Sequence, residues 1–474
     1  MKTRIGAILH SGNILNNGYL QCKYLRSNGV TADCINVDYS HSQGQPEWTE
    51  SRFEKKLPDW DIDLSRVATD FARPDWYFQG NQRDLVEYSH ARRPFFTRML
   101  EKLNTRVSSR YLKSNRWEID GFTIDKGSLT RRHLEFLLNS FSKHFPSAST
   151  PLSVRDILEY YPRANAQSTL VRDYSILHGY ALDSIYGMIS APNVPFLCHE
   201  HGHLRDFPFE ESARGRLYAL SLKLAKKVII TNSDCISSAN RLELKNTIFI
   251  PHLVDDEKFK PETTSFRSQL MQEFDCDRII VAPARHHWKE LADSFEGTWT
   301  KGNDVIVKGV AKMLQRFPDL NLKLIFFEWG QEVEDTKRLI REFELDAFVV
   351  WRPLCSKPVL KDYLNAADVV LDQFNKFTGS FGAIVPESMA CAKPVMLNFN
   401  PDVHHWCYPE LPPVCNAYDD ESLSNELSKL LMDEQYKNQT GEAGYKWYKK
   451  YHNSSVVTDK IIDVYHEIND EFGR

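Results

Sequence analysis

The chain contains 474 residues with a formal net charge of −5, of which 42% are hydrophobic and 26% are charged. At roughly 100–200 residues per domain, this length predicts two or three domains that can each bury a core. The acidic balance argues against a dedicated nucleic-acid-binding protein, since such proteins gather positive charge on one face. No apolar stretch approaches the roughly 18–20 residues that cross a bilayer.

Nine cysteines are widely spaced, and none forms a C-x-x-C pair, which excludes zinc-ribbon and thioredoxin-like motifs. Several lie in apolar runs, as buried free thiols do, so a reducing compartment fits best. Met1–His10 lacks the pattern of a signal peptide, and we predict a cytoplasmic protein. Basic clusters such as Arg92-Arg93 suit either a solvated helix face or a peripheral contact with the inner face of a membrane.

The N-terminus shows the pattern of a βαβ unit. Arg4–His10 predicts a buried strand, Tyr19–Ser27 an amphipathic helix and Ala32–Val37 a second strand. Gly12 and Asn13 lie in the turn between the first strand and the helix, where free N–H groups at a helix start attract phosphate. Because many βαβ units bind nothing at this turn, a phosphate site and a plain turn both fit the pattern.

Residues 43–116 show no regular period and are rich in aromatic side chains, so we expect an irregular insertion with short helices. Strands and helices resume after it and continue to Pro251. The expected strands are Trp117–Ile124, Ser175–Leu182, Val194–His199, Lys227–Thr231 and Thr247–Ile250, and the expected helices are Ser128–Phe145, Leu217–Lys226 and Cys235–Leu244.

A second α/β block follows the polar, proline-containing linker Asp255–Gln272. Its clearest helix is Asp304–Phe317, where apolar residues recur on one face. The other expected helices are Glu332–Phe343, Lys357–Ala366, Phe381–Cys391 and Asp420–Asp433, followed by one or two long helices over Tyr445–Phe472. The expected strands are Arg278–Pro283, Asn321–Phe327, Ala347–Val350, Val369–Asp372 and Pro394–Asn398. Alternating strands and helices predict parallel sheets covered on both faces, with ligands held between the carboxyl ends of the two sheets.

The segment Gly379–Met396 combines small residues with a helix start. Ser380, Gly382 and Ala383 leave the backbone N–H groups open to an anion. Glu387, about one turn into the helix, is placed to accept hydrogen bonds from two vicinal hydroxyls, such as those of a ribose. This combination suits a nucleoside diphosphate. The alternative is a buried helix whose glutamate only complements the helix dipole.

The same residue string resembles the donor-binding segment of retaining GT-B glycosyltransferases of the group-1/family-4 type, which include many bacterial polysaccharide transferases. That family carries two glutamates separated by seven residues, with a Phe-Gly pair between them and a tail similar to residues 388–395. The resemblance implies a donor site at Ser380, Phe381, Gly382, Ala383 and Glu387. The first glutamate of the pair falls on Gly379, so the sugar half of the site has no assigned carboxylate.

Two further segments follow in the order of that family. Ile250–Phe259 resembles its interdomain "I-P-N-G-V-D…F" segment, and Val281–Arg285 followed by Lys301 resembles its "G-R…E-K-G" segment, across a longer gap than usual. The resemblance implies that Arg285 and Lys301 hold the donor diphosphate. Two cations suit this role because they stabilise the charge of the leaving group without a metal; the alternative is a pair of surface residues.

Phe196–Arg205 is the densest cluster of ionisable groups in the first block and follows an expected strand. Family members carry a histidine near the sugar at this place, so the resemblance implies that His201 and Glu200 act in catalysis, orienting an acceptor hydroxyl or stabilising the leaving phosphate. A zinc site of His199, His201 and His203 is an alternative, although no fourth ligand can be named. Purely structural histidines are another alternative.

Taken together, the resemblance implies an α/β protein with the GT-B architecture: two Rossmann-like domains facing a cleft, and C-terminal helices crossing back to the first domain. The expected division is an acceptor domain at residues 1–255 with the insertion at 43–116, a donor domain at 256–444 and the returning helices at 445–474. Gly12 and Asn13 are expected on the donor side of the cleft.

The function implied is transfer of a hexose from a nucleoside-diphosphate sugar to a hydroxyl of a glycan, lipid-linked or protein acceptor. We expect a retaining enzyme without metal or other cofactor, in bacterial-type synthesis of surface glycans or glycoconjugates, and no nucleic-acid partner. Two alternatives remain: a catalytically degenerate nucleotide-sugar-binding protein, suggested by Gly379, and a GT-B epimerase.

Overall fold

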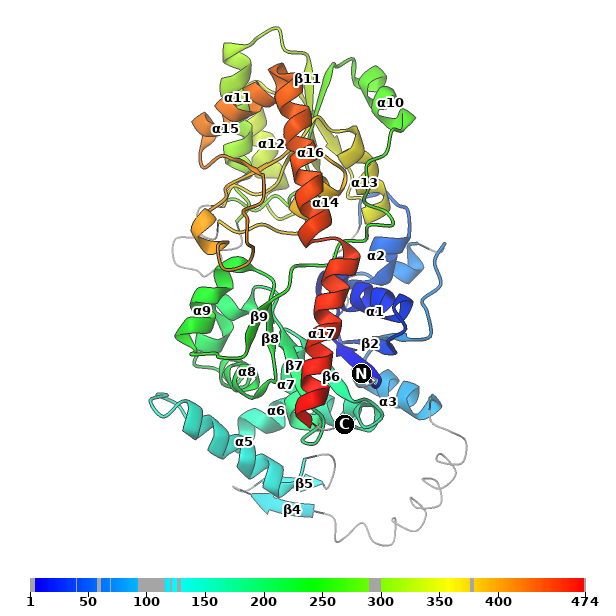
Figure 1. Ribbon diagram of the computed structural model, residues 1–474, viewed down its shortest axis with the longest axis vertical. Coiled ribbons are helices and arrows are strands. Elements are labelled where there is room, and N and C mark those ends of the chain that lie inside the picture. Colours follow the sequence, from blue (N-terminus) through cyan, green and yellow to red (C-terminus); the bar gives the residue numbers. More distant parts are fainter. Residues whose placement is uncertain are drawn as a thin grey trace.

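The computed structural model describes residues 5–39, 41–57, 61–68, 70–92, 116–119, 122–125, 129–289, 300–375 and 379–472. Two parallel sheets lie one above the other in Figure 1. The first has seven strands, in the order β3 (Tyr77–Gly80), β2 (Ala32–Val37), β1 (Ile8–Ser11), β6 (Ile176–Tyr180), β7 (Phe196–His199), β8 (Val228–Ile230) and β9 (Thr247–Phe249). The second has six, in the order β12 (Val349–Arg352), β11 (Leu322–Phe327), β10 (Arg278–Ala282), β13 (Val369–Leu371), β14 (Val395–Leu397) and β15 (Cys415–Asn416). The expected α/β fold is thus confirmed.

Helices pack around both sheets (Figure 1). Those around the first sheet are α1 (Asn17–Ser27), α2 (Pro46–Glu50), α3 (Gln82–Ala91), α5 (Arg131–His144), α6 (Val154–Val171), α7 (Asp183–Ser190), α8 (Ala213–Leu224) and α9 (Ile236–Arg241). Those around the second are α10 (Ser265–Phe274), α11 (Asn303–Arg316), α12 (Val333–Glu342), α13 (Lys357–Ala366), α14 (Ile384–Ala390) and α15 (Asp420–Met432), and the chain ends with α16 (Glu434–Tyr451) and α17 (Ser454–Phe472).

Successive residues of the buried strands pack into different apolar clusters. In β1, Ile8 belongs to the cluster that includes α1 and α17, whereas Leu9 belongs to the one that includes α6 and α7. In β10, Ile279 and Ile280 alternate between two clusters in the same way. Because side chains of a strand point alternately to its two faces, burial of both faces explains the consecutive apolar residues Ile8-Leu9 in β1 and Ile279–Ala282 in β10.

The expected irregular insertion at 43–116 is wrong in its central part. Tyr77–Gly80 pairs in parallel with β2, and α3 follows after a capping box formed by Asn81 and Asp84, so the α/β repeat continues there. The expected strand Trp117–Ile124 is two short antiparallel strands, β4 (Arg116–Ile119) and β5 (Phe122–Asp125). Residues 93–115 lie outside the described residues.

The C-terminal helices connect the two halves of the molecule, as the red helices in Figure 1 show. Helix α16 packs against α14, and α17 packs against α1. Where α16 gives way to α17, Asp256 accepts hydrogen bonds from the backbone N–H and the hydroxyl of Ser454, at 3.1 and 2.7 Å. Apolar residues of α17 such as Ile461 and Tyr465 are buried in the same cluster as Ile8 of the first sheet.

Residues 51–55, which we call the strap, reach from the first half of the molecule to the second. Glu54 forms an antiparallel β-bridge with Cys355, and the backbone N–H of Ser356 donates to the carbonyl of Phe53 at 2.9 Å. These bonds lie immediately before α13, which α2 also contacts. The strap therefore fixes the start of α13 relative to the first sheet.

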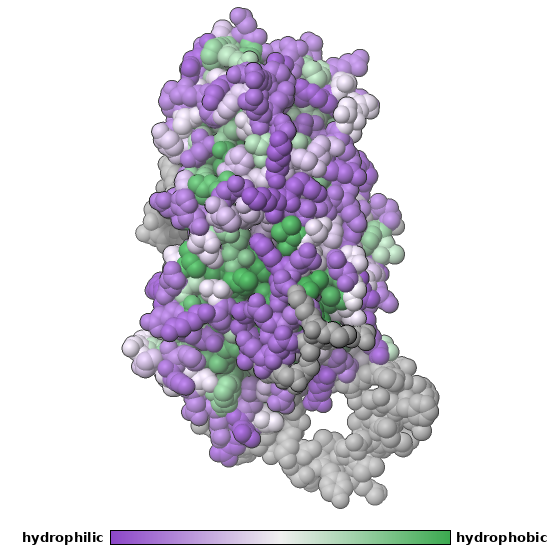
Figure 2. All heavy atoms as spheres, viewed as in Figure 1, coloured by the Kyte–Doolittle hydropathy of each residue, from purple (hydrophilic) through white to green (hydrophobic). Residues whose placement is uncertain are grey.

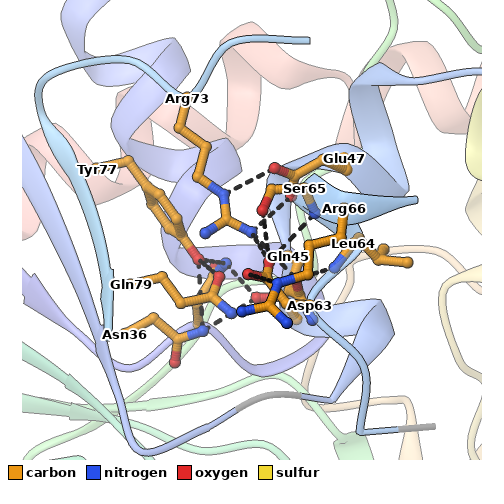
Figure 3. Close-up of polar contacts among 12 residues, drawn as sticks. Asn36, Gln45, Glu47, Asp63, Leu64, Ser65, Arg66, Arg73, Tyr77 and Gln79 are labelled. Atoms are coloured by element: carbon orange, nitrogen blue, oxygen red, sulfur yellow. Dashed lines mark hydrogen bonds and ion pairs between the residues drawn. The ribbon is translucent and has the colours of Figure 1, made fainter. Parts of the chain in front are cut away.

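A polar network holds the segment around the strap in place (Figure 3). Arg73 donates to both carboxylate oxygens of Glu47, at 2.7 and 3.2 Å, and to Asp63 at 3.0 Å. Gln45 accepts hydrogen bonds from Arg73 at 3.1 Å and from the backbone N–H of Leu64 at 2.8 Å. Side-chain bonds, rather than a backbone ladder, order this segment, which explains why it shows no regular period.

The face of the molecule seen in Figure 2 is largely hydrophilic, with apolar residues gathered mainly near its middle. Among the residues that the structure describes, no helix is long and apolar enough to cross a membrane. Of the basic pair considered for membrane contact, Arg92 forms an ion pair with Asp33 at 2.9 Å, and Arg93 lies outside the described residues.

Candidate functional site

The carboxyl ends of the two sheets face each other. Ser233, which follows β8, lies with its hydroxyl 3.3 Å from that of Ser380 and 3.2 Å from Nε2 of His404. Trp406 donates from its indole nitrogen to the carbonyl of Ser233 at 3.0 Å. Ser380 and His404 follow β13 and β14, so the loops after the strands of both sheets meet. Doubly wound sheets bind ligands at this edge, where the strand order reverses.

Two cations lie together at this reversal point in the second sheet, between β10 and β13. Arg285 follows β10, and Lys301 precedes α11 and donates to Oε1 of Gln373 at 2.6 Å. Burial lowers the pKa of Lys301 to about 8, and repulsion from Arg285 and from Arg205 adds to the shift. The structure thus brings the expected pair of cations together and places Arg205, from the first half of the molecule, near them.

Glu387 lies in α14 and is almost fully buried, with 6% of its surface exposed. Lys357, the first residue of α13, donates to both of its carboxylate oxygens at 2.6 and 2.7 Å. Burial raises the pKa of Glu387, and Lys357 counteracts this shift. Burial also lowers the pKa of His252 to about 4, and the charge of Lys357 adds to that effect. Lys357 therefore lies between the expected donor carboxylate and a histidine near the first sheet.

The loop before α14 has little room for the glutamate that the family carries at its first position. Gly379 has a φ of 55°, and a Cβ built on it would lie 2.4 Å from that of Asn400. Phe381 stacks on the imidazole of His404, with ring centroids 4.9 Å apart. Gly382, by contrast, has open space around its Cα, and Ala383, the residue before α14, provides no side-chain cap for the helix.

We therefore expect Gly379→Glu to lower the free energy of unfolding by about 1–3 kcal/mol, the usual cost of a left-handed non-glycine residue, without creating a new sugar-binding carboxylate. Gly382→Ala is the matched control and should change stability by less than about 0.5 kcal/mol. Urea unfolding of both variants measures the difference. Equal effects of the two substitutions would contradict the assignment of strain to residue 379.

Five histidine side chains form a stacked column at the carboxyl edge of the first sheet. Ring centroids are 4.5 Å apart between His10 and His178, 5.0 Å between His178 and His199, 4.9 Å between His199 and His201, and 5.4 Å between His201 and His252. Burial lowers the pKa of every member. The column is therefore neutral at pH 7.

Hydrogen bonds fix the tautomers at the inner end of the column. Tyr180 donates to Oε1 of Gln21 at 2.9 Å, so Nδ1 of His10, 2.9 Å from the same hydroxyl, must donate to it. Nε2 of His10 then accepts from Tyr465 at 3.2 Å, and Nδ1 of His178 donates to Tyr465 at 2.7 Å. A hydroxyl carries one proton, which makes this assignment consistent for both tyrosines, while the amide nitrogen of Gln21, 3.5 Å from Nδ1 of His199, then finds no acceptor at that atom.

His201 is the member of the column in which both ring nitrogens have unused hydrogen-bonding capacity, whereas in His199 only Nε2 lacks a partner among the described residues. His199 donates from Nδ1 to Nε2 of His178 at 2.8 Å, which follows from the tautomer above. Among the described residues, both ring nitrogens of His201 are buried without a hydrogen-bond partner. Such groups are costly unless a ligand or water meets them, so His201 retains its place as a candidate catalytic residue.

Glu200, the other residue expected to act in catalysis, is held by hydrogen bonds within the first half of the molecule. Its carboxylate accepts hydrogen bonds from the backbone N–H of Gly202 and from the side-chain amide of Asn232, the latter at 2.9 Å. Burial raises its pKa, and the charge of Arg205 counteracts this shift. These bonds tie the loop after β7 to the loop after β8.

Asn13 likewise has its side chain fully engaged. Its carbonyl oxygen accepts from the backbone N–H of Tyr19 at 2.8 Å, and its amide nitrogen donates to Asn16 and to the carbonyl of Gly44, both at 2.8 Å. It therefore shapes the turn rather than binding the donor through its side chain. Gly12 has a φ of 96° and lies at the point where the strand order of the first sheet reverses.

No group of three histidine, cysteine, aspartate or glutamate residues is arranged to hold a metal within the described ranges. For His199, His201 and His203, the zinc ligands considered above, the stacking of the first two rings explains why they do not converge on one point. The sequence interpretation also missed His252, Lys357 and Asp372. Asp372 directly follows β13, and its position at the end of a predicted parallel strand could have marked it as a candidate site residue.

No family model matches the chain. It is 35% identical over 159 residues to a D-inositol 3-phosphate glycosyltransferase of Pseudarthrobacter chlorophenolicus, a match that covers 28% of this chain and 37% of that protein. A protein of the same name from an Arthrobacter species is 33% identical over 98 residues, which cover 20% of this chain and 23% of that protein. The similarity thus spans less than half the length of either relative.

Solved structures are similar over much greater lengths. A sucrose-phosphate synthase from Thermosynechococcus elongatus superposes with a TM-score of 0.57 and 14% identity, covering 98% of this chain and 100% of that one. Anabaena HepE in complex with UDP and glucose superposes with a TM-score of 0.52 and 15% identity, covering 71% and 97%. At these identities the likeness concerns the fold. The chain has the GT-B fold, with two parallel α/β sheets whose carboxyl edges face each other.

Proposed function

We propose that this protein is a glycosyltransferase that moves a sugar from a nucleoside-diphosphate sugar to a hydroxyl acceptor. The observation that carries the proposal is the pair Arg285 and Lys301 at the reversal point of the second sheet, with Glu387 in the neighbouring helix. Two partly desolvated cations suit a diphosphate, and a buried carboxylate suits ribose hydroxyls. The names of the partial relatives and the UDP bound to HepE support the same donor class.

In the proposed reaction the bond between the sugar C1 and the diphosphate breaks, and the acceptor oxygen forms the new bond to C1. The acceptor proton passes to an oxygen of the departing phosphate, so no protein base is needed and configuration is retained. Arg285 and Lys301 stabilise the developing charge without a metal. Neutral His201 hydrogen-bonds the sugar or the acceptor hydroxyl.

The proposed setting is the cytoplasm, because all nine cysteines are free thiols and eight of them are buried, as in a reducing compartment. Acceptors of the glycan, lipid-linked and protein types all remain candidates, and the proposed context is synthesis of surface glycans or glycoconjugates. A second candidate function, nucleotide-sugar binding without transfer, is favoured by one observation: Gly379 stands where the family has a sugar-binding glutamate.

A panel of nucleoside diphosphates and their sugars tests the proposal by thermal shift and by release of the nucleotide. We expect at least one nucleoside diphosphate to raise Tm at millimolar concentration. If none does, both candidate functions fail. Nucleotide release that depends on an added acceptor would support transfer, whereas binding without any release would support the second candidate.

A further inference from the structure

Asp372 occupies the position in the second sheet where a ligand is most expected. It directly follows β13, and β13 lies beside β10, whose end leads to Arg285. The reversal of strand order between these two strands opens the carboxyl edge for ligands. The loops that follow β10 and β13 thus carry a cation, Arg285, and a carboxylate, Asp372.

The carboxylate of Asp372 is buried but only partly satisfied. Its exposed fraction is 4%, and it accepts a hydrogen bond from the backbone N–H of Gly382. Its Oδ2 is buried without a hydrogen-bond partner among the residues that the structure describes. Burial raises the pKa of Asp372 to about 6, with Lys301 counteracting the shift. An ionised oxygen left unpaired in this way is costly to the fold, and such a cost is typical of a functional site.

The neighbours of Asp372 indicate which part of a ligand would meet it. The charged groups that act on it are Lys301, Glu387 and Lys357. These groups place it beside the proposed site of the diphosphate, to which the donor sugar is attached, and also near the proposed ribose site. A phosphate would be repelled by a carboxylate, whereas a sugar hydroxyl would donate to it.

We propose that Asp372 binds hydroxyl groups of the donor sugar and so serves as a specificity-determining residue of this protein. This inference rests on the proposed function. It answers the question raised by Gly379, whose backbone and neighbour Asn400 leave no room for a glutamate. The sugar-binding carboxylate then comes from the end of a strand instead of from the loop before α14.

The test compares binding of UDP with UDP-glucose, or of GDP with GDP-mannose if the panel selects guanosine, by titration calorimetry. For Asp372→Asn we expect an affinity about 10- to 100-fold lower for the nucleotide sugar, as for loss of a charged hydrogen bond, and less than a twofold change for the nucleoside diphosphate. The exposed Asp402 provides the control variant Asp402→Asn, which should change neither.

Deoxy-sugar nucleotides give a second measurement, and its first part uses only the wild-type protein. At least one deoxy donor should bind the wild-type protein about 10-fold or more weakly than the full donor, and this loss should vanish in Asp372→Asn. Equal weakening of diphosphate and nucleotide sugar by Asp372→Asn, or no weakening of either, would overturn the inference while leaving the proposed function intact. A wild-type protein that binds no nucleoside diphosphate would instead overturn both.

Discussion

Replacing Lys301 by alanine is expected to lower kcat/KM for the nucleotide sugar by about 10²–10³-fold, the usual effect of removing one group that stabilises charge in the transition state. The reason is its position: its ammonium group lies beside Arg285, where the leaving diphosphate gains charge. Because the pKa of Lys301 is lowered to about 8, affinity for a nucleoside diphosphate should fall as pH rises through that value. Initial rates and a pH series of binding constants measure both effects.

Lys308→Ala is the matched control for Lys301→Ala. Lys308 lies in α11, close in sequence, and pairs with Asp304 at 2.8 Å on a partly exposed helix face. Removal of its side chain should leave kcat/KM within about twofold of the wild-type value, since exposed ion pairs within a helix contribute little. If both lysine variants lost activity equally, or if Lys301→Ala kept it, the diphosphate assignment would have to be abandoned.

Replacing Glu387 by alanine should remove nucleoside-diphosphate binding and also destabilise the fold, by about 3–5 kcal/mol. The carboxylate contributes to the proposed ribose site, and it is also the partner of Lys357 at 2.6 Å. Lys357 has an exposed side-chain fraction of only 19%, so its charge would be left without compensation in a poorly hydrated place. Thermal unfolding and calorimetric titration of the variant report the two losses separately.

The double variant Lys357→Met, Glu387→Leu separates stability from binding. An apolar pair of similar volume often restores the stability that a broken ion pair loses, so we expect a free energy of unfolding near that of the wild type. Nucleoside-diphosphate binding should remain absent, because no carboxylate is left. Recovery of binding in this double variant would show that Glu387 acts only through folding.

Much of the fold could be predicted because local residue patterns mark many of its strands and helices. Lys357–Ala366 and Ala32–Val37 were predicted with the observed bounds. In the helix, Val359, Leu360, Tyr363 and Leu364 recur at the helical period. Helix α6 was missed, although Ser153 and Asp156 form a capping box that the sequence displays. The strap was beyond prediction, because its order depends on bonds to residues far away in the chain, such as Ser356.

Residues of the candidate site could be predicted where a short motif indicates their role. Arg285 and Lys301 could be named because they match the "G-R…E-K-G" segment of the resembling family and because two cations suit a diphosphate. For Glu200, the sequence does not reveal that Asn232 and Gly202 hydrogen-bond its carboxylate. Asp372 was missed since its unpaired oxygen becomes visible only when all neighbours are placed.

The position of α17 has a consequence for how this protein is made. The first sheet is complete once β9 has emerged at Phe249, yet the helix that covers one of its faces begins at Ser454. At about 5–20 residues per second, a ribosome needs on the order of 10–40 s to supply that helix. During this interval the nascent chain carries an uncovered apolar face around Ile8 and Leu197, a natural binding surface for chaperones. A premature stop near the end of the message would therefore damage the half of the molecule that was synthesised first.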